Sequence, residues 1–310
     1  MTPPMFERVA LIGLGLIGSS LSHAIRRGSL ARTIVGNAWT EKTRDTALRL
    51  GLVSSAYATA AEAAHDADLI VLCAPVGVCG ELAREMAPAL RAGAIVTDVG
   101  SVKGAIVREV GPHLPQGVHF IPGHPIAGTE HSGPEAGFAE LFDGRWCVLT
   151  PPAGTNQAAI DKLSAFWKAC GSHVEVMDAD HHDMVLAITS HVPHLIAYNI
   201  VNTARHLERV TDSEVIKFSA GGFRDFTRIA ASDPVMWRDV FLNNKEAVLE
   251  MLGRFSEDLT ALQRAIRFGD GETLHKLFVE ARATRRGIIE AGQDTEAPDF
   301  GRRAPKTSGS

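Results

Sequence analysis

The side chain best suited to acid–base chemistry in this chain is His124, which lies in the stretch IPGHPIAGTEHSG at residues 121–133. An imidazole titrates near neutral pH, so it can accept or release a proton during a reaction. The surrounding glycines and prolines can hold the ring in a rigid loop without burying it in a helix. From these surroundings alone, a packed structural histidine and a catalytic histidine are both open, and the rest of the sequence must decide.

A glycine-rich motif near the start of the chain predicts a dinucleotide site. The apolar run RVALI at residues 8–12 is typical of a buried parallel strand, and helical character follows the motif GLGLIG. In this context the first glycine makes a tight turn, the second admits the pyrophosphate, and the third lets helix and strand pack. The phosphates then lie at the helix N-terminus. The expected contacts from the motif are Gly13, Gly15, Leu16, Ile17 and Gly18.

The segment after the second predicted strand bears on the choice between NAD and NADP. About 20 residues beyond the motif, an acidic residue would hold the ribose 2′-hydroxyl of NAD, but this chain reads GNAWT at residues 36–40. Lys42 and Arg44 close by would tolerate a 2′-phosphate, although a solvated helix face is the better explanation of at least one of them. NAD and NADP therefore both stay open. Further cofactor contacts are expected from Ala38, Trp39, Thr40, Ala74 and Pro75.

Ser101 follows another predicted strand, residues 94–98, and His124 follows the predicted strand 118–121. Ligands bind at the carboxyl ends of parallel strands in such sheets, so both side chains are expected to face one crevice. A plain helix N-cap is an equally open interpretation of Ser101. Two further predicted strands, 146–149 and 173–177, with a helix between them, extend the alternation of strands and helices. That alternation predicts a parallel sheet covered by helices on both faces.

After residue 178 the sequence predicts only helices, including a long one at residues 245–268. The predicted fold is therefore an α/β Rossmann-like parallel-sheet domain followed by an all-α helical dimerisation domain. We assign residues 1–178 to the dinucleotide-binding domain, 179–292 to the helical domain and 293–310 to a disordered tail. Because a long helix needs a partner to cover its apolar face, we expect a homodimer.

Two polar clusters interrupt the helical half, at SHVPH (residues 190–194) and GGFRDFTR (residues 221–228). Arg224 and Arg228 could grip a substrate carboxylate as a fork, or they could form ion pairs with Asp225 or Asp233. Which arginine dominates stays open. The segment HHD at residues 181–183 has no third ligand at a recognised metal-site spacing, so no metal is expected.

Composition excludes several classes of function. The formal net charge of −5 leaves no basic footprint, which argues against nucleic acid as a partner. The apolar run at the N-terminus is broken by glycines well before the ~20 residues needed to span a bilayer. The expectation is a cytoplasmic protein without a membrane segment.

Taken together, these motifs resemble the prephenate/arogenate (cyclohexadienyl) dehydrogenases of tyrosine biosynthesis, over about residues 7–291. The resemblance rests on motifs that occur in the order found in that family. They are the segments at residues 13–18, 98–103, 123–130, 190–194, 221–228 and 232–237. The missing acid at Ala38 is the departure from the family pattern, and it puts the preference for NAD in doubt.

The resemblance implies a role for each matching residue. His124 is similar to a catalytic histidine that hydrogen-bonds the ring hydroxyl of the substrate, and Ser101 to a serine that orients both that histidine and the nicotinamide. Arg228 is similar to an arginine that binds a substrate carboxylate. Five more residues resemble ones that line or border the pocket, with the acid at its mouth: Ser190, His194, Thr129, Glu130 and Trp237.

The implied reaction is oxidative decarboxylation of prephenate to 4-hydroxyphenylpyruvate, of arogenate to tyrosine, or of both. Two alternatives stay open at this point: a two-domain dehydrogenase acting on a β-hydroxy acid, and a non-catalytic dinucleotide sensor. The sequence decides neither between the two substrates nor whether tyrosine inhibits.

Overall fold

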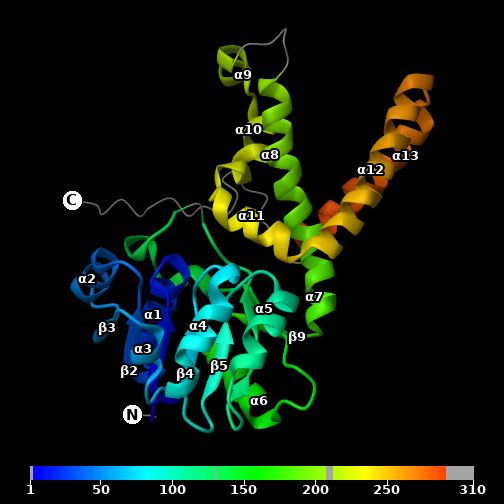
Figure 1. Ribbon diagram of the computed structural model, residues 1–310. Helices are drawn as coiled ribbons and strands as arrows, with labels where there is room; N and C mark the ends of the chain where they lie inside the picture. Colours follow the sequence, from blue (N-terminus) through cyan, green and yellow to red (C-terminus); the bar gives the residue numbers. More distant parts are fainter. Residues whose placement is uncertain (1–2, 130, 207–211, 291–310) are drawn as a thin grey trace. The chain divides into compact units, whose positions relative to one another are not determined.

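The computed structural model of the chain describes residues 3–129, 131–206 and 212–290 (Figure 1). The predicted pocket residue Glu130 and the predicted tail 293–310 lie outside these residues. By internal contacts the chain forms two compact units, residues 1–251 and 252–310. The first unit contains both sheets and all helices up to the first turns of the helix Lys245–Phe268.

Six parallel strands form the first sheet, in the order β3-β2-β1-β4-β5-β6. Their apolar runs are buried on both faces, as in β4, where every residue is buried. The order reverses between β1 and β4, which opens a crevice at the carboxyl ends of these strands. The predicted Rossmann-like fold is therefore confirmed. The strands are β1 (Phe6–Ile12), β2 (Ala31–Asn37), β3 (Ser55–Tyr57), β4 (Leu69–Leu72), β5 (Ile95–Asp98) and β6 (His119–Phe120).

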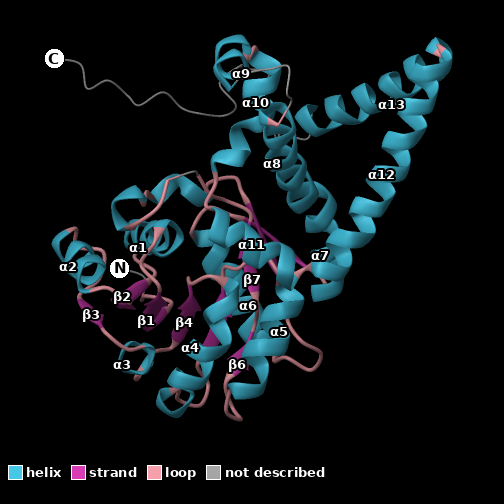
Figure 2. Cartoon of the chain, turned by 45° about the horizontal axis from the view of Figure 1, so that its top comes forward, coloured by secondary structure: helices cyan, strands magenta, loops and turns pink. Residues whose placement is uncertain are grey.

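Helices cover both faces of this sheet and create two apolar cores (Figure 2). On one face, α1 and α6 bury side chains such as Leu21 and Trp167, both fully inaccessible to solvent. On the other face, α3, α4 and α5 bury side chains such as Met86 and Ile106. The helices are α1 (Leu16–Gly28), α2 (Glu41–Arg49), α3 (Ala60–Ala64), α4 (Cys79–Met86), α5 (Lys103–Val110) and α6 (Gln157–Ala169).

A second, three-stranded sheet has the order β7-β8-β9 and corrects the sequence prediction. We expected the strands β8 (Trp146–Leu149) and β9 (His173–Val176) to extend the large parallel sheet, but they belong to the second sheet, where they pair with each other. Instead, β8 pairs in antiparallel fashion with β7 (Gly123–Pro125). Only two residues separate β6 from β7, and a parallel neighbour needs a crossover of a dozen or more residues. His124 therefore lies on a strand and not in a loop.

The helices of the C-terminal half begin with one continuous helical stretch, Ala179–Arg205. It passes through a single π-helical turn, Ala187–His191, which ends two residues before Pro193. Because Pro193 lacks a backbone N–H, it cannot donate a hydrogen bond to the preceding turn of the helix. The π-helical turn accommodates this missing hydrogen bond. The elements are α7 (Ala179–Leu186), α8 (Val192–Arg205), α9 (Asp212–Phe218), α10 (Gly221–Thr227) and α11 (Pro234–Asn243).

By length and composition alone, the stretch Ala179–Arg205 could also cross a membrane, with a mean hydropathy of 1.4 in its most apolar window. However, it carries the polar side chains of His182, Asp183 and His191, all of which are buried in contacts with other parts of the protein. Of that window, 28% is buried, and a single helix of this length and composition is weak evidence for a membrane span.

Two long helices end the described chain. The helix α12 (Lys245–Phe268) has the bounds predicted from its periodicity, and α13 (Gly271–Glu290) follows a turn at Gly269, whose φ of +67° favours glycine. Asp270 supports the start of α13, because its carboxylate accepts hydrogen bonds from the backbone N–H and the hydroxyl of Thr273.

Candidate active site

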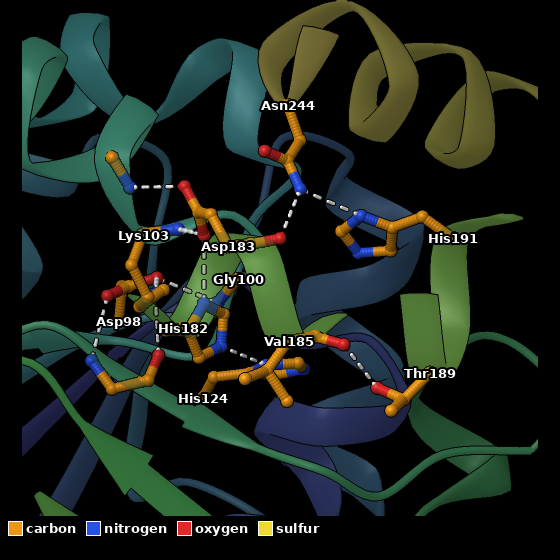
Figure 3. Close-up of polar contacts among 12 residues, drawn as sticks. Asp98, Gly100, Lys103, His124, His182, Asp183, Val185, Thr189, His191 and Asn244 are labelled. Atoms are coloured by element: carbon orange, nitrogen blue, oxygen red, sulfur yellow. Dashed lines mark hydrogen bonds and ion pairs between the residues drawn. The ribbon is translucent and has the colours of Figure 1, made fainter. Parts of the chain in front are cut away.

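His124 lies in the middle of β7 with only 8% of its surface exposed, and its ring meets a second buried imidazole (Figure 3). The distance between His124 Nδ1 and His182 Nε2 is 2.8 Å. The two rings are nearly perpendicular, with centroids 5.1 Å apart. One ring nitrogen of His124, Nδ1, is thus bound by protein, and Nε2 takes no part in this contact.

His182 is in turn bound by the next residue of α7, Asp183, with 2.8 Å between Nδ1 and Oδ1. The Asp183 carboxylate accepts two more hydrogen bonds, from the backbone N–H of Lys103 at 2.7 Å and of Gly104 at 2.8 Å. These N–H groups belong to the first turn of α5, which has no side-chain cap of its own. A carboxylate from one helix therefore caps another, and the helix dipole favours its negative charge there.

A buried ion pair fixes the strand that carries His124. The Lys103 ammonium contacts Asp98 Oδ2 and donates a hydrogen bond of 2.7 Å to the carbonyl oxygen of Gly123. The other Asp98 oxygen accepts the N–H of Gly123 at 3.0 Å. Both charged side chains are fully buried, and burial raises the pKa of Asp98 while Lys103 opposes that shift. Because the backbone N–H and the carbonyl oxygen of Gly123 are both bound, β7 is held at the carboxyl end of β5.

The surroundings keep the His124 imidazole neutral. Burial lowers its pKa well below the usual value, and the neighbouring His182, Lys103 and His191 lower it further. Burial also lowers the pKa of His182, although Asp183 opposes that shift. A neutral ring can accept a proton, as a general base must.

A third buried histidine joins this site to the later helices. The Asn244 side-chain amide nitrogen contacts the Asp183 carbonyl oxygen at 2.9 Å and His191 Nδ1 at 3.0 Å. Burial lowers the pKa of His191 to about 4. Asn244 therefore links the junction of α11 and α12 to α7 at the position of Asp183 (Figure 3).

Several predicted pocket residues lie together next to this network. The His194 ring stacks on Trp237, with centroids 3.7 Å apart and an interplanar angle of 23°. His194 Nδ1 donates to the carbonyl oxygen of Ser190 at 2.8 Å, and the nearby charge of Arg228 contributes to lowering the pKa of His194, after burial. Trp237 also contacts the His191 ring, at a centroid distance of 6.0 Å. Ser190, His194, Arg228 and Trp237, from three separate sequence segments, thus lie close to one another.

Other predicted residues are placed differently. Among the described residues, Ser101 makes no side-chain hydrogen bond, and His124 Nδ1 is bound by His182 instead. The N-cap interpretation of Ser101 is wrong, because α5 begins at Lys103 with Val102 at the cap position. Thr129 is exposed, and its hydroxyl accepts the backbone N–H of His131.

The two arginines of the second polar cluster are both exposed. Arg224 lies 3.9 Å from Asp225, at the outer limit for an ion pair, whereas Arg228 begins the short 3₁₀ turn Arg228–Ala231 near His194. The charge of Arg228 helps to lower the pKa of His194, so Arg228 lies near the stacked His194 and Trp237 rings.

The glycine motif has the geometry that a dinucleotide requires. Gly13 has a φ of +110°, and a Cβ atom there or at Gly18 would collide with neighbouring backbone, so each closes the turn tightly. By contrast, a Cβ at Gly15 would meet nothing within 4 Å. Gly15 is also the N-cap of α1, which lacks a side-chain cap. Open space in front of uncapped N–H groups fits the binding of a pyrophosphate.

The segment expected to meet the adenosine end lies at the carboxyl end of β2. Trp39 is 95% exposed, and Thr40 caps α2 by accepting the N–H of Thr43. The Arg44 guanidinium donates hydrogen bonds to the carbonyl oxygens of Ala38 and Trp39 at 2.8 and 3.1 Å. Arg44 thus holds the shape of this segment. The remaining predicted contacts, Ala74 and Pro75, directly follow Cys73 at the end of β4.

Sequence reasoning missed several members of the site. His182 and Asp183 were visible as adjacent titratable residues at the start of an apolar helix, but we considered them only as weak metal ligands. Within the described ranges, no group of three or more His, Cys, Asp or Glu side chains is arranged to hold a metal ion. Asn244 has no local signal, since its role depends on a long-range contact with α7.

Comparison with known proteins agrees with this geometry. Residues 21–176 match the family model for the nucleotide-binding domain of prephenate dehydrogenase, and residues 178–280 match the model for its dimerization domain. A cyclohexadienyl dehydrogenase of Zymomonas mobilis is 41% identical over 284 residues, which cover 92% of this chain and 97% of that protein. A prephenate dehydrogenase of Bacillus subtilis is 32% identical, over 92% of this chain and 76% of that protein.

Among solved structures, prephenate dehydrogenase from Aquifex aeolicus in complex with hydroxyphenyl propionate and NAD⁺ superposes with a TM-score of 0.85. It is 34% identical, and the match covers 91% of this chain and 98% of that one. Both domains, the order of the motifs and the fold thus agree. The chain belongs to the prephenate dehydrogenase family.

Proposed function

We propose that this chain catalyses the oxidative decarboxylation of prephenate, of arogenate or of both, with NAD or NADP as cofactor. The observation that carries the proposal is the placement of His124. It is a buried, neutral imidazole with one nitrogen bound by protein, on a strand that follows the dinucleotide-binding sheet. The names of its relatives supply the substrate class.

The reaction divides into tasks that the site's residues can perform. As the hydroxyl-bearing ring carbon of the substrate loses hydride, its hydroxyl proton passes to His124 Nε2. The bond to the ring carboxylate then breaks and carbon dioxide leaves. The electron pair passes through the ring, which becomes aromatic, to the carbonyl oxygen, and that oxygen takes a proton back from the His124 imidazolium. The bound nicotinamide supplies the hydride acceptor. Since the electrons released on decarboxylation enter the substrate's own ring, the site needs only a base and exact positioning, which can be worth ~7–11 kcal/mol.

Substrate binding is proposed to involve the cluster next to His124. Arg228 would hold a carboxylate, because a guanidinium binds carboxylates bidentately. His194 and Trp237 form a flat, stacked wall that suits a six-membered ring. We propose that Ser190, Thr129 and Glu130 border this pocket, and that Ser101 contacts the nicotinamide.

The first prediction concerns activity itself. Purified protein mixed with either prephenate or arogenate, and with either NAD or NADP, should increase the absorbance of reduced nicotinamide in at least one of the four combinations. The pattern of the four rates would give both preferences at once. No reduction in any combination, with cofactor binding shown separately, would refute the proposal and favour a dinucleotide sensor.

The second prediction tests the base. His124→Asn should lower kcat by roughly 10²–10⁴-fold, the usual contribution of a general base, and leave cofactor binding unchanged. His113→Asn, an exposed histidine, is the matched control and should retain wild-type turnover. Near-normal turnover of His124→Asn would show that His124 is not the base.

The third prediction tests the carboxylate contact. Arg228→Ala should raise the Michaelis constant for the substrate by roughly 10-fold or more, as expected on losing a charge-assisted hydrogen bond. The control is Arg238→Ala, because Arg238 is a mostly exposed arginine paired with Asp239. An unchanged Michaelis constant for Arg228→Ala would exclude it from carboxylate binding.

We also propose that the chain forms a homodimer through its helical half and acts in the cytoplasm. Support comes from large apolar side chains that stand exposed on α12 and α13, which a partner would cover. They are Leu249, Leu259, Ile266, Phe268, Leu277, Phe278, Val279 and Ile288. Sedimentation equilibrium should give about twice the chain mass of 33.2 kDa. A single species at the chain mass would contradict the dimer.

A further inference from the structure

We propose that His182 and Asp183 are positioning residues for this reaction: they lock His124 in the tautomer whose Nε2 lone pair faces the substrate. The inference rests on the proposed role of His124 and goes beyond it, because it assigns a function to a buried His–Asp pair on another element. The pair lies on α7 and not on the strand that carries His124. Its role follows from the direction of each hydrogen bond.

The direction is set at Asp183. Both of its carboxylate oxygens accept backbone N–H groups from the first turn of α5, at 2.7 and 2.8 Å. Backbone N–H groups only donate, and an ionised carboxylate only accepts. The 2.8 Å contact between Asp183 Oδ1 and His182 Nδ1 therefore requires the proton to be on His182 Nδ1.

The proton on His182 Nδ1 decides the next link. A neutral imidazole carries one proton, so His182 Nε2 must be an acceptor. His124 Nδ1 lies 2.8 Å from that acceptor and must donate to it. The neutral His124 ring then has no proton on Nε2. This is the form that can accept the hydroxyl proton of the substrate, and the opposite tautomer could not.

The same chain of contacts stabilises the product of proton transfer. When His124 Nε2 takes the substrate proton, the ring becomes a cation whose Nδ1–H still donates to His182. The Asp183 carboxylate lies behind His182 and offers a negative charge in a buried setting, where electrostatic interactions are strong. No proton needs to move along the chain, because only the bond from the substrate oxygen to its hydrogen breaks and only the bond to Nε2 forms.

The network is rigid enough to perform this task. His182 is fully buried and Asp183 is 8% exposed, and the backbone carbonyl of Asp183 is bound by Asn244. The ionisable groups that face His124 or its partner come from β5, α5, β8, α7 and the π-helical turn. They are Asp98, Lys103, Cys147, His182, Asp183 and His191. Among them, Asp183 is the carboxylate bonded in line with His182 and His124.

The experiment compares three variants in steady-state kinetics across pH. His182→Phe removes both hydrogen bonds, and Asp183→Asn removes the negative charge. His182→Gln can still present an amide oxygen to His124 Nδ1 but cannot connect that ring to the carboxylate. The matched controls are the exposed neighbours on the same helix, His181→Phe and Asp180→Asn, which should behave as wild type.

We expect His182→Phe to lower kcat by about 10²-fold, the low end of a general-base contribution, with little change in the Michaelis constant or in cofactor binding. His182→Gln should recover part of that loss, since the tautomer is retained. In Asp183→Asn the acid limb of kcat/KM should move to lower pH by about one unit, because loss of an anion lowers the pKa of the imidazolium.

Contrary outcomes are distinct from failure of the proposed function. If His124→Asn is inactive but His182→Phe and His182→Gln keep wild-type kcat and an unmoved acid limb, the base stands and the positioning role is overturned. Equal losses of kcat in His182→Phe and His182→Gln, with no movement of the acid limb of the kcat/KM profile, would indicate a merely structural role. That result would also overturn the positioning role. Should Asp183→Asn fail to fold, because Asp183 also caps α5, the two His182 variants still decide.

Discussion

The hydrogen bonds between the Asp183 carboxylate and the first two N–H groups of α5 are the contact on which the rest of the site depends. An uncapped helix N-terminus and a buried carboxylate are each costly, and together each satisfies the other. The contact also fixes where the first C-terminal helix meets the nucleotide-binding sheet. Asp183 then contacts His182, and His182 contacts His124.

The first residue of α5 adds a second constraint in the same place. Lys103 uses its backbone N–H for Asp183 and its ammonium for Asp98 and Gly123. Buried charges need such complete pairing, because removal from water costs several kcal/mol for each ion. Strands from both sheets, β5 and β7, and the helices α5 and α7 thus meet at Lys103. The backbone N–H groups of Lys103, Gly104 and Gly123 and the carbonyl oxygen of Gly123 satisfy the buried charged side chains at this point.

The sequence allowed the Rossmann-like sheet, its nucleotide motif and the long helix α12 to be predicted, because these depend on local patterns: apolar runs, glycines at fixed spacing and helical periodicity. The motifs around His124 also allowed it to be singled out as a candidate, and its catalytic role stays a prediction. The assignment of β8 to the parallel sheet failed because pairing between strands is a long-range property. The same reason hid Asn244, whose partner Asp183 lies far away in sequence.

His182 and Asp183 are an instructive intermediate case. Their residue types were noticed, but adjacent titratable residues on a helix indicate no particular chemistry until the direction of each hydrogen bond is known. Ser101 does follow a strand, as the sequence indicates. However, the helix for which it was a possible N-cap begins two residues later, at Lys103.

We propose that His124 is a neutral imidazole protonated on Nδ1, and this tautomer can be measured directly. Protein labelled with nitrogen-15 histidine, compared with the His124→Asn variant for assignment, gives the protonation of each ring nitrogen from its NMR chemical shift and its coupling to carbon-bound ring protons. We expect Nδ1 to carry the proton and Nε2 to lack one, in both His124 and His182. A proton on Nε2 of the neutral His124 ring would contradict it.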